Sequence, residues 1–457
     1  MRKLSNRTWL ASLLVVALLI GTGMIVFRYI KYSEQWYSHR DTTPVYSEDS
    51  FLCGQILDRS DILLLDATKG RQYPEDVVLR RTTVHLLGDV QGNVPAYLLS
   101  YYRDEMNSFN LFDGGNPPDD AKLRLTVSSQ AQKVALEALG ERKGTVGVYN
   151  YRTGEILCMV STPSFDPLNP SEVDDSEAYE GAYVNRFLHA SYTPGSTFKL
   201  VTAAAAISEI KDLDERTFVC DGYWYIAGER LKCNATHGEI NFDQALTKSC
   251  NVVFAQLALE VGKESLMKYA QMIGIDTTLE FDGLQTKSGN IDLEEAGEYD
   301  TAWAGVGQFT DSINACQFMT YMGAIANGGI SAQPYLVESA YSKGTETYRA
   351  SLRYGNRILS TKTAERLVLA MHEAVVNNYG EHYFAGLYAG AKSGTAEQDG
   401  GKTANGLFAG FVQDENYPLA FVVVVEEGGS GSGAGVPIIG KVLQACVAAM
   451  DTDGKEN

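Results

Sequence analysis

The hydrophobic and polar positions of this 457-residue chain follow a different pattern in each region. Trp9 to Phe27 form a span of 19 residues without a charge, which is long enough to cross a bilayer as a helix. The span is long for a cleaved signal peptide and no A-x-A site follows it, so an uncleaved signal anchor is favoured over a cleaved signal. Because basic residues flank both ends, the positive-inside rule gives little information on orientation.

The next region has a mixed pattern. Its short apolar runs at Gln55–Leu57 and Ile62–Leu65 predict strands. The segment from Asp113 to Asp120 contains paired glycines and paired prolines, which predicts a linker. We therefore divide the chain into a cytoplasmic tail with the anchor helix, a small membrane-proximal module and one large domain, at residues 1–32, 33–122 and 123–457.

Strand patterns occur at both ends of the large domain, and helical patterns dominate its middle. The expected strands are 123–127, 144–150, 154–160, 387–396, 407–412 and 419–426. The expected helices are 128–140 with a serine cap, 251–261 and 315–327 within a helical region from 191 to 378, and a closing helix at 436–450. This order indicates an α+β domain in which an antiparallel sheet, completed by both ends of the segment, is flanked by helices and joined to a mostly helical subdomain.

Composition and charge restrict the function. With 45% hydrophobic and 21% charged residues the chain is globular, and its net charge of -19 argues against a nucleic-acid binder. Seven cysteines are present and none lies in a C-x-x-C motif. Cys220 and Cys233 could form a disulfide outside the cell or remain two reduced thiols, and the sequence leaves both open.

One short stretch carries candidate chemistry. Pro194 and Gly195 predict a turn and good helix formers begin at Lys199, so Ser196 is expected in the first turn of a helix, with Lys199 on the same face. A serine hydroxyl needs a base to act as a nucleophile, and a desolvated lysine is such a base. The helix N-terminus adds N–H groups that favour an oxyanion. Taken alone, the same pair is also found at the start of an ordinary amphipathic helix.

Two further motifs make the chemistry specific. Ser249-Cys250-Asn251 stands at the start of a helical run, and Lys392-Ser393-Gly394-Thr395 lies in an expected strand. The order S-x-x-K, S-x-N and K-[ST]-G, on helix, helix start and strand, resembles the penicilloyl-serine transferase group. The segment from Thr153 to Pro167 is similar to the opening of a penicillin-binding-protein transpeptidase domain, and the segment from Gly54 to Gly88 resembles the pedestal of class B penicillin-binding proteins. The segment from Asn377 to Phe384 departs from the usual approach to the K-[ST]-G strand.

The resemblance implies a penicillin-binding-protein transpeptidase fold for residues 123–457, a non-catalytic pedestal for 33–122, and a peptidoglycan DD-transpeptidase activity. Ser196 would attack the D-Ala-D-Ala carbonyl of a stem peptide while Lys199 takes its proton. Ser249 would pass a proton to the leaving amine, and Asn251 would orient the base and the substrate.

The K-[ST]-G strand would supply the remaining groups. Lys392 would contribute positive charge, and the hydroxyls of Ser393 and Thr395, on either side of Gly394, would bind the terminal carboxylate. The backbone N–H groups of Ser196 and Thr395 would form the oxyanion hole. β-Lactams would be inhibitors trapped as acyl-enzymes.

Alternatives remain within and outside this superfamily. A DD-carboxypeptidase or a β-lactamase would share the nucleophile, but no E-x-x-L-N segment of the class A β-lactamases occurs. A penicillin-sensing or catalytically silent cell-wall assembly protein is the alternative of another class. We expect a single-pass membrane protein with its catalytic domain outside the cytoplasm and a separate glycosyltransferase partner.

Several other motifs are set aside. Gly429-x-Gly431-x-x-Ala434 fits a loose dinucleotide fingerprint, but too few residues follow it, and the glycine-rich run 428–435 is interpreted as a flexible loop at the rim of the site. Cys250 is expected to be a small buried filler. Since no H-E-x-x-H or i, i+4 histidine pair occurs, no metal site or cofactor is expected, and His237 is assigned a structural hydrogen bond.

Overall fold

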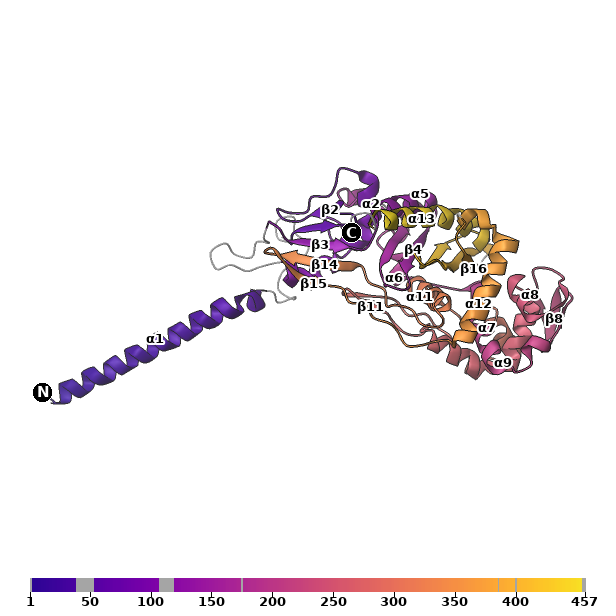
Figure 1. Ribbon diagram of the computed structural model, residues 1–457, viewed down its shortest axis with the longest axis horizontal. Helices are drawn as coiled ribbons and strands as arrows, with labels where there is room; N and C mark the ends of the chain where they lie inside the picture. Colours follow the sequence, from indigo (N-terminus) through magenta and orange to yellow (C-terminus); the bar gives the residue numbers. More distant parts are fainter. Residues whose placement is uncertain are drawn as a thin grey trace.

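The computed structural model describes residues 2–37, 53–106, 119–173, 176–384, 386–398 and 401–453. Its central layer is a five-stranded antiparallel sheet with the strand order β16-β17-β18-β4-β5 (Figure 1). The strands are β4 (Gly144–Asn150), β5 (Ile156–Thr162), β16 (Ala389–Ala396), β17 (Asn405–Val412) and β18 (Leu419–Val425). All seven residues of the valine-rich β18 are buried, as expected for a strand that is covered on both faces.

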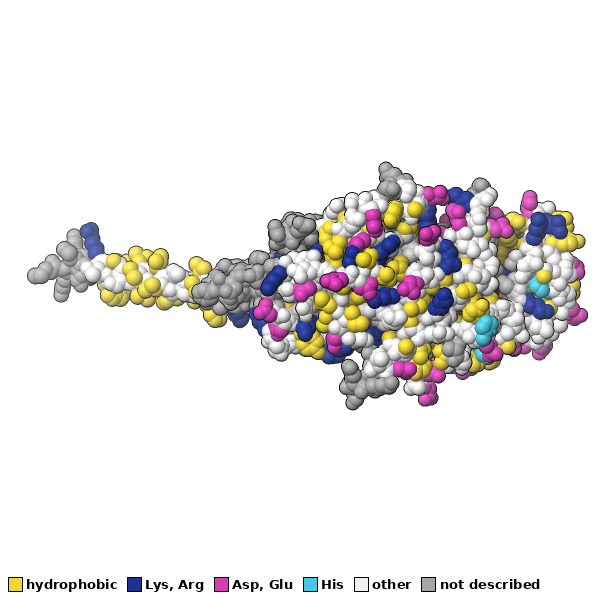
Figure 2. Space-filling model, turned by 90° about the horizontal axis from the view of Figure 1, so that it is seen from above, with side chains coloured by type: hydrophobic (Ala, Val, Ile, Leu, Met, Phe, Trp, Pro, Cys, Tyr) yellow, Lys and Arg dark blue, Asp and Glu magenta, His cyan; other side chains and the backbone are white. Residues whose placement is uncertain are grey.

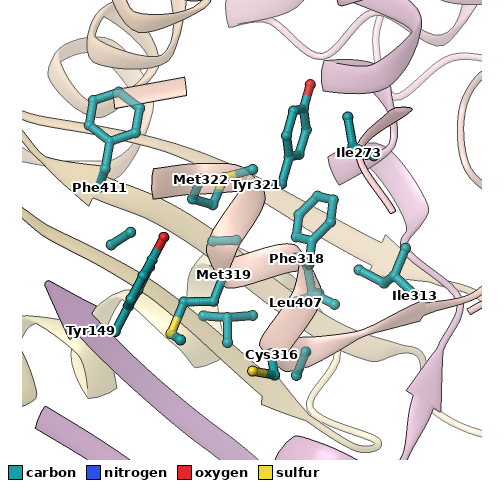
Figure 3. Packing of buried hydrophobic residues seen from close by; sticks show 14 of the residues in the cluster. Tyr149, Ile273, Ile313, Cys316, Phe318, Met319, Tyr321, Met322, Leu407 and Phe411 are labelled. Atoms are coloured by element: carbon teal, nitrogen blue, oxygen red, sulfur yellow. The ribbon is translucent and has the colours of Figure 1, made fainter. Parts of the chain in front are cut away.

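Helices cover both faces of this sheet. One face packs against α5 (Ser129–Leu139) and α13 (Gly431–Asp453), through residues such as Phe408 and Phe421. The other face packs against α11 (Ala315–Ala326), and Figure 3 shows sheet residues around this helix. The residues on the two sides of that contact are Tyr149, Leu407 and Phe411 of the sheet and Cys316, Met319 and Met322 of α11. Successive side chains of β17 and β18 are buried alternately on the α11 side and on the side of α5 and α13. This alternation fixes the register of the two strands.

Capping side chains define where the helices of this layer begin. Ser128 accepts a hydrogen bond from the backbone N–H of Ala131 at the start of α5. Asn314 accepts from the N–H groups of Cys316 and Gln317 at the start of α11. Both caps satisfy N–H groups that have no partner within the helix.

A mostly helical subdomain lies beyond β16. It contains α7 (Lys199–Glu209), α8 (Phe242–Thr247), α9 (Asn251–Met272), α10 (Glu298–Ala304) and α12 (Thr361–Ala374). Two short hairpin-like sheets join it, formed by β7 (Phe218–Cys220) with β10 (Gly238–Ile240) and by β8 (Tyr223–Ile226) with β9 (Glu229–Lys232). The long helix α9 is interrupted at Gly262, whose φ of 81° is not helical.

A second five-stranded sheet has the order β15-β14-β3-β1-β2. Its strands are β1 (Gln55–Leu57), β2 (Leu63–Asp66), β3 (Lys122–Leu125), β14 (Val337–Ser342) and β15 (Thr345–Arg349). The N-terminal part of the chain also contains the helices α2 (Val77–Leu87), α3 (Tyr97–Tyr101) and α4 (Arg103–Met106). Strands from before and after residue 122 therefore share one sheet. In Figure 1 this sheet and the subdomain of α8 and α9 lie at opposite ends of the body. The division at residue 122 stays a prediction.

Short elements complete the fold. They are α6 (Arg186–His189), β6 (Ser191–Tyr192), β11 (Glu280–Phe281), β12 (Leu284–Gln285), β13 (Ile313–Asn314), a π-helical turn (Val375–Tyr379), and 3₁₀ turns at Pro170–Glu172, Glu177–Tyr179, Gly195–Thr197, Leu213–Glu215 and Glu381–Phe384.

The N-terminal helix α1 (Arg2–Tyr37) contains the apolar span. Its segment Arg7–Arg28 has a mean hydropathy of 2.6 and is 0% buried, and Figure 2 shows apolar side chains along it. Within the described residues a second segment, Gly431–Thr452 of α13, is also long and apolar enough, but it is 56% buried and packs on the central sheet. The second segment is therefore a core helix of the domain, whereas α1 is consistent with a membrane anchor.

The predicted α+β architecture with an antiparallel sheet and an N-terminal apolar helix is confirmed. The interpretation of residues 428–435 as a loop was wrong for residues 431–435, which form the start of α13, whereas residues 428–430 lie outside any helix or strand. Glycine is accepted there since any larger side chain at Gly431 or Gly435 would collide with β16 or β17. In the predicted linker, residues 113–118 lie outside the described residues.

Candidate active site

The nucleophile candidate lies on a tight turn at the edge of the helical subdomain. Ser196 belongs to the 3₁₀ turn Gly195–Thr197, and α7 begins directly afterwards at Lys199. The expected first turn at Ser196 is thus a 3₁₀ turn that leads into α7, and Lys199 Nζ lies 2.9 Å from Ser196 Oγ. Ser196 is half-buried and Lys199 is 0% exposed, so the base is withdrawn from water while the hydroxyl remains accessible.

Lys199 lies at the centre of a hydrogen-bond network. Its Nζ donates to Asn251 Oδ1 at 2.6 Å, and it lies 2.9 Å from the carbonyl oxygen of Ser249 and 3.1 Å from Ser249 Oγ. Ser249 has a φ of 55°, a left-handed conformation that is uncommon for serine. This conformation turns both oxygens of Ser249 toward the same amine.

A second lysine approaches from the sheet. Lys392 Nζ, on β16, donates to Ser249 Oγ at 2.9 Å and to the carbonyl oxygen of Ser393 at 2.9 Å. Burial is the main cause that lowers the pKa of Lys199 to about 7. Burial, followed by the charge of Lys199, lowers the pKa of Lys392 well below its usual value. Ser249 Oγ therefore lies between two amines that both have depressed proton affinity.

Glycines allow the turn and the strand to meet backbone against backbone. A Cβ at Gly195 would lie 2.6 Å from the carbonyl oxygen of Thr395, and a Cβ at Gly394 would lie 2.4 Å from that of Pro194. Gly307, with a φ of 84°, closes the other side of the turn, where a Cβ would lie 2.0 Å from the carbonyl oxygen of Gly195. Contacts below 3.0 Å are not available to real Cβ atoms, so the nucleophile is held against β16 only because these positions are glycine.

The remaining residues of the strand motif line the outer edge of the site. Ser393 is half-buried and Thr395 is exposed. The carbonyl oxygen of Thr395 accepts a hydrogen bond from Gln308 Nε2 at 2.8 Å, which ties the strand to the loop after α10. Tyr379 Oη lies 3.0 Å from Ser393 Oγ and accepts the backbone N–H of Ser393 at 3.0 Å.

The structure thus brings the predicted residues together. The side chains of Ser196, Lys199, Ser249, Asn251 and Lys392 form one connected network. The substrate-binding candidates Ser393, Gly394 and Thr395 continue along the same strand.

Sequence reasoning missed the position of Tyr379. It lies in the segment from Asn377 to Phe384, which departs from the family pattern, so the departure itself was the signal that this rim is built differently.

Sequence reasoning also missed a cluster next to Asn251. Cys220, Cys233 and Cys250 are all free, and their sulfur atoms lie with a ring nitrogen of His237 within 4.8 Å of one another. Cys250 is therefore not merely a buried filler between two site residues. The signal was available, since three of the seven cysteines and one histidine fall between residues 220 and 250.

A serine hydroxyl next to a buried lysine, backed by a second hydroxyl and a second lysine, is the arrangement of a serine enzyme that forms acyl intermediates. Residues 144–444 match the sequence model of the penicillin-binding protein transpeptidase domain. The chain belongs to this family, and the class B resemblance is confirmed.

Curated relatives agree with this family. The chain is 28% identical over 451 residues to stage V sporulation protein D of Bacillus subtilis (strain 168), covering 92% of this chain and 66% of that protein. It is 28% identical over 380 residues to the peptidoglycan D,D-transpeptidase PbpA of Mycolicibacterium smegmatis, covering 75% of each chain.

Solved structures share the fold. Penicillin-binding protein A from M. tuberculosis, as a penicillin G acyl-enzyme complex, has a TM-score of 0.72 and 23% identity, and the match covers 86% of this chain and 99% of that chain. A D,D-transpeptidase domain from Eggerthella lenta has a TM-score of 0.72 and 24% identity, and covers 87% of this chain and 98% of its own.

Proposed function

We propose that this chain is a membrane-anchored DD-transpeptidase that cross-links peptidoglycan stem peptides through an acyl intermediate on Ser196. The observation that carries the proposal is the 2.9 Å distance between Ser196 Oγ and the amine of Lys199. Four oxygens lie within hydrogen-bond distance of this amine. As a neutral amine, Lys199 has two N–H donors for Asn251 and Ser249 and one lone pair that accepts the proton of Ser196.

The first half-reaction follows from this arrangement. Lys199 removes the proton of Ser196 as its oxygen attacks the carbonyl carbon of the D-Ala-D-Ala peptide bond. The negative charge that develops on the carbonyl oxygen is stabilised by the backbone N–H groups of Ser196 and Thr395. The leaving D-alanine amine receives its proton through Ser249, whose hydroxyl contacts both lysines.

The strand residues hold the substrate. The terminal carboxylate of the stem peptide lies along Ser393 and Thr395, whose hydroxyls donate to it, near the amine of Lys392. Gly394 lets β16 pack directly against the turn of Ser196, which places Ser393 and Thr395 beside the nucleophile. Asn251 donates its Nδ2 to the carbonyl oxygen of Lys232 at 2.9 Å, and this contact orients the amide oxygen toward Lys199.

In the second half-reaction, an amine from a neighbouring stem attacks the acyl-serine and forms the cross-link. β-Lactams resemble the D-Ala-D-Ala end and stop at the acyl stage. The proposal includes a catalytic domain on the outer side of the membrane and a separate glycosyltransferase partner that supplies glycan strands. A protein with the same fold (TM-score 0.72, 19% identity) comes from a study of a peptidoglycan synthase complex that coordinates polymerization and crosslinking.

The test is the mass of the intact full-length chain, in detergent, after incubation with benzylpenicillin. We expect a lasting adduct on the wild type and none on Ser196→Ala. Benzylpenicillin turnover without an adduct would favour a β-lactamase. If neither an adduct nor turnover is observed, the acyl-serine mechanism is contradicted.

A second assay separates cross-linking from hydrolysis. The chain is supplied with nascent, uncross-linked peptidoglycan, and the digested products are separated by mass. Cross-linked dimers are expected, whereas stem peptides that have only lost their terminal D-alanine would identify a DD-carboxypeptidase.

A further inference from the structure

A cluster of three cysteines and one histidine lies directly behind the active site. Cys220 ends β7, Cys233 follows β9, His237 precedes β10, and Cys250 is the residue before α9. One ligand atom from each lies within 4.8 Å of the other three. Cys220 and Cys250 are buried, and the other two are half-buried.

Two separations within the cluster match those of a tetrahedral metal site. Around Zn²⁺, with Zn–S bonds of about 2.3 Å and Zn–N bonds of about 2.0–2.1 Å, two sulfur ligands lie about 3.8 Å apart and a sulfur and a nitrogen about 3.6 Å apart. In the structure Cys233 Sγ lies 3.8 Å from Cys250 Sγ and 3.6 Å from His237 Nδ1. The four side chains therefore already stand close to the positions that one ion requires.

The local backbone holds the ligands in these positions. β7 pairs with β10 so that Cys220 faces Gly238, and the N–H of His237 donates to the carbonyl oxygen of Cys220 at 3.1 Å. The N–H of Cys233 donates to the carbonyl oxygen of Gly222 at 2.9 Å. The N–H of Asn251 points at Cys233 Sγ at 3.2 Å, which is a typical donor contact of a metal-bound thiolate.

The segment from 218 to 250 also needs a cross-link of some kind. Its strands are three or four residues long and its outer aromatic residues, Tyr223 and Tyr225, are exposed. Segments this small bury little apolar surface and are commonly stabilised by disulfides or metals. A disulfide could join only two of the three cysteines, and it would leave the third and the histidine without a role.

We propose that Cys220, Cys233, His237 and Cys250 bind one Zn²⁺ ion. Three thiolates and one imidazole are a typical ligand set of structural zinc, with no position left open for a substrate. The proposal replaces the expectation of no metal, which considered only histidine spacing.

The ion sits where it can position the catalytic residues. Cys250 lies between Ser249 and Asn251 in the chain, and Cys233 accepts the N–H of Asn251. Cys233 also follows Lys232, whose carbonyl oxygen accepts from Asn251 Nδ2. Two of the four ligands therefore fix the segment that presents Ser249 and Asn251 to Lys199. This positioning role rests on the proposed function, whereas zinc binding itself does not.

The test is the zinc content of the full-length chain, purified in detergent with reductant and without metal-affinity resin. Because the four ligands form one site, we expect elemental mass spectrometry to find about one zinc per chain. Cys220→Ser and His237→Ala should lose the zinc. Cys446→Ser, which removes a buried cysteine outside the cluster, should keep it, and His237→Cys should also keep it because four thiolates bind zinc equally well.

A second measurement covers the case in which the variants do not fold. The wild type is treated with chelator and titrated with Co²⁺, and thiolate-to-cobalt absorption in the near ultraviolet should saturate at one ion per chain. Wild type without zinc and without this absorption would overturn the proposal. Equal zinc in wild type, Cys220→Ser and His237→Ala would also overturn it, as would a disulfide within the cluster in a wild-type chain purified without reductant.

The positioning role has its own readout. Removal of zinc should slow acylation by benzylpenicillin, and added Zn²⁺ should restore the rate. Acylation that fails while the zinc is bound would count against the proposed function alone. An unchanged rate after complete removal of zinc would refute the positioning role.

Discussion

The buried amine of Lys199 should make acylation of Ser196 strongly dependent on pH. Burial lowers the pKa of Lys199 from 10.5 to about 7, and the charges at Cys233 and Cys250 oppose this shift only in part. Only a neutral amine can accept the serine proton. The rate should therefore follow the neutral fraction of Lys199: low when the pH is below the pKa, and level above it.

The size of the effect follows from the two pKa values. At about pH 7.5 an amine with a pKa of about 7 is neutral in roughly three quarters of molecules, whereas an amine with the usual lysine pKa is neutral in about one in a thousand. Withdrawal from water thus raises the reactive fraction by several hundredfold. Below pH 7 the acylation rate should fall about tenfold for each pH unit.

The assay is the second-order rate constant for acylation by benzylpenicillin, measured from quenched samples between about pH 5.5 and 9. Lys199→Arg is the control. Because arginine stays protonated, Ser196 of this variant should be acylated slowly across the whole pH range. Its fold is checked separately by thermal unfolding. A wild-type rate that is constant over this range, or that still rises about tenfold per pH unit between about pH 8 and 9, would refute the argument that burial creates the base.

Three further predictions concern single contacts. Asn251→Ala removes a hydrogen bond to the buried amine, so acylation should slow by roughly 10- to 100-fold, and a change below twofold would show that the contact does not orient the base. Gly307→Ala would place a Cβ 2.0 Å from the carbonyl oxygen of Gly195, so the unfolding free energy should fall by about 1–3 kcal/mol and acylation should slow. An unchanged melting temperature together with an unchanged acylation rate would show that the turn is not rigid. Tyr379→Phe leaves the N–H of Ser393 without its acceptor, which should lower the free energy of unfolding in denaturant by about 1–3 kcal/mol and weaken substrate binding. An unaltered denaturant midpoint would argue against Tyr379 as the acceptor that holds Ser393.

Much of the fold was predictable because the hydrophobic pattern determined it. The expected strands at 144–150, 154–160, 407–412 and 419–426 have apolar positions that only a sheet covered by helices can bury. The ends of elements were less predictable. The glycine run at 428–435 has low helical propensity, yet residues 431–435 begin α13, where β16 and β17 leave no room for a Cβ at Gly431 or Gly435.

The site was predictable as a set of residues but not as a set of contacts. The three motifs identified Ser196, Lys199 and Lys392, whereas nothing local in the sequence shows that Lys392 shares the hydroxyl of Ser249 with Lys199. Tyr379 reaches Ser393 from a π-helical turn that no periodicity indicates. Contacts of this kind depend on tertiary packing, and residue spacing along the chain does not contain them.

The site is assembled where two parts of the domain meet. Ser196, Lys199, Ser249 and Asn251 come from the helical subdomain, and Lys392 comes from the central sheet. On one side the two parts are held by backbone packing at glycines, which leaves little freedom to adjust. On the other side, Ser249 lies between α8 and α9, where Leu246, Cys250 and Val253 are buried, whereas the strands that precede α8 are only three or four residues long. A zinc ion at the proposed site would join these short strands, through Cys220 at the end of β7 and Cys233 directly after β9, to the residue between Ser249 and Asn251.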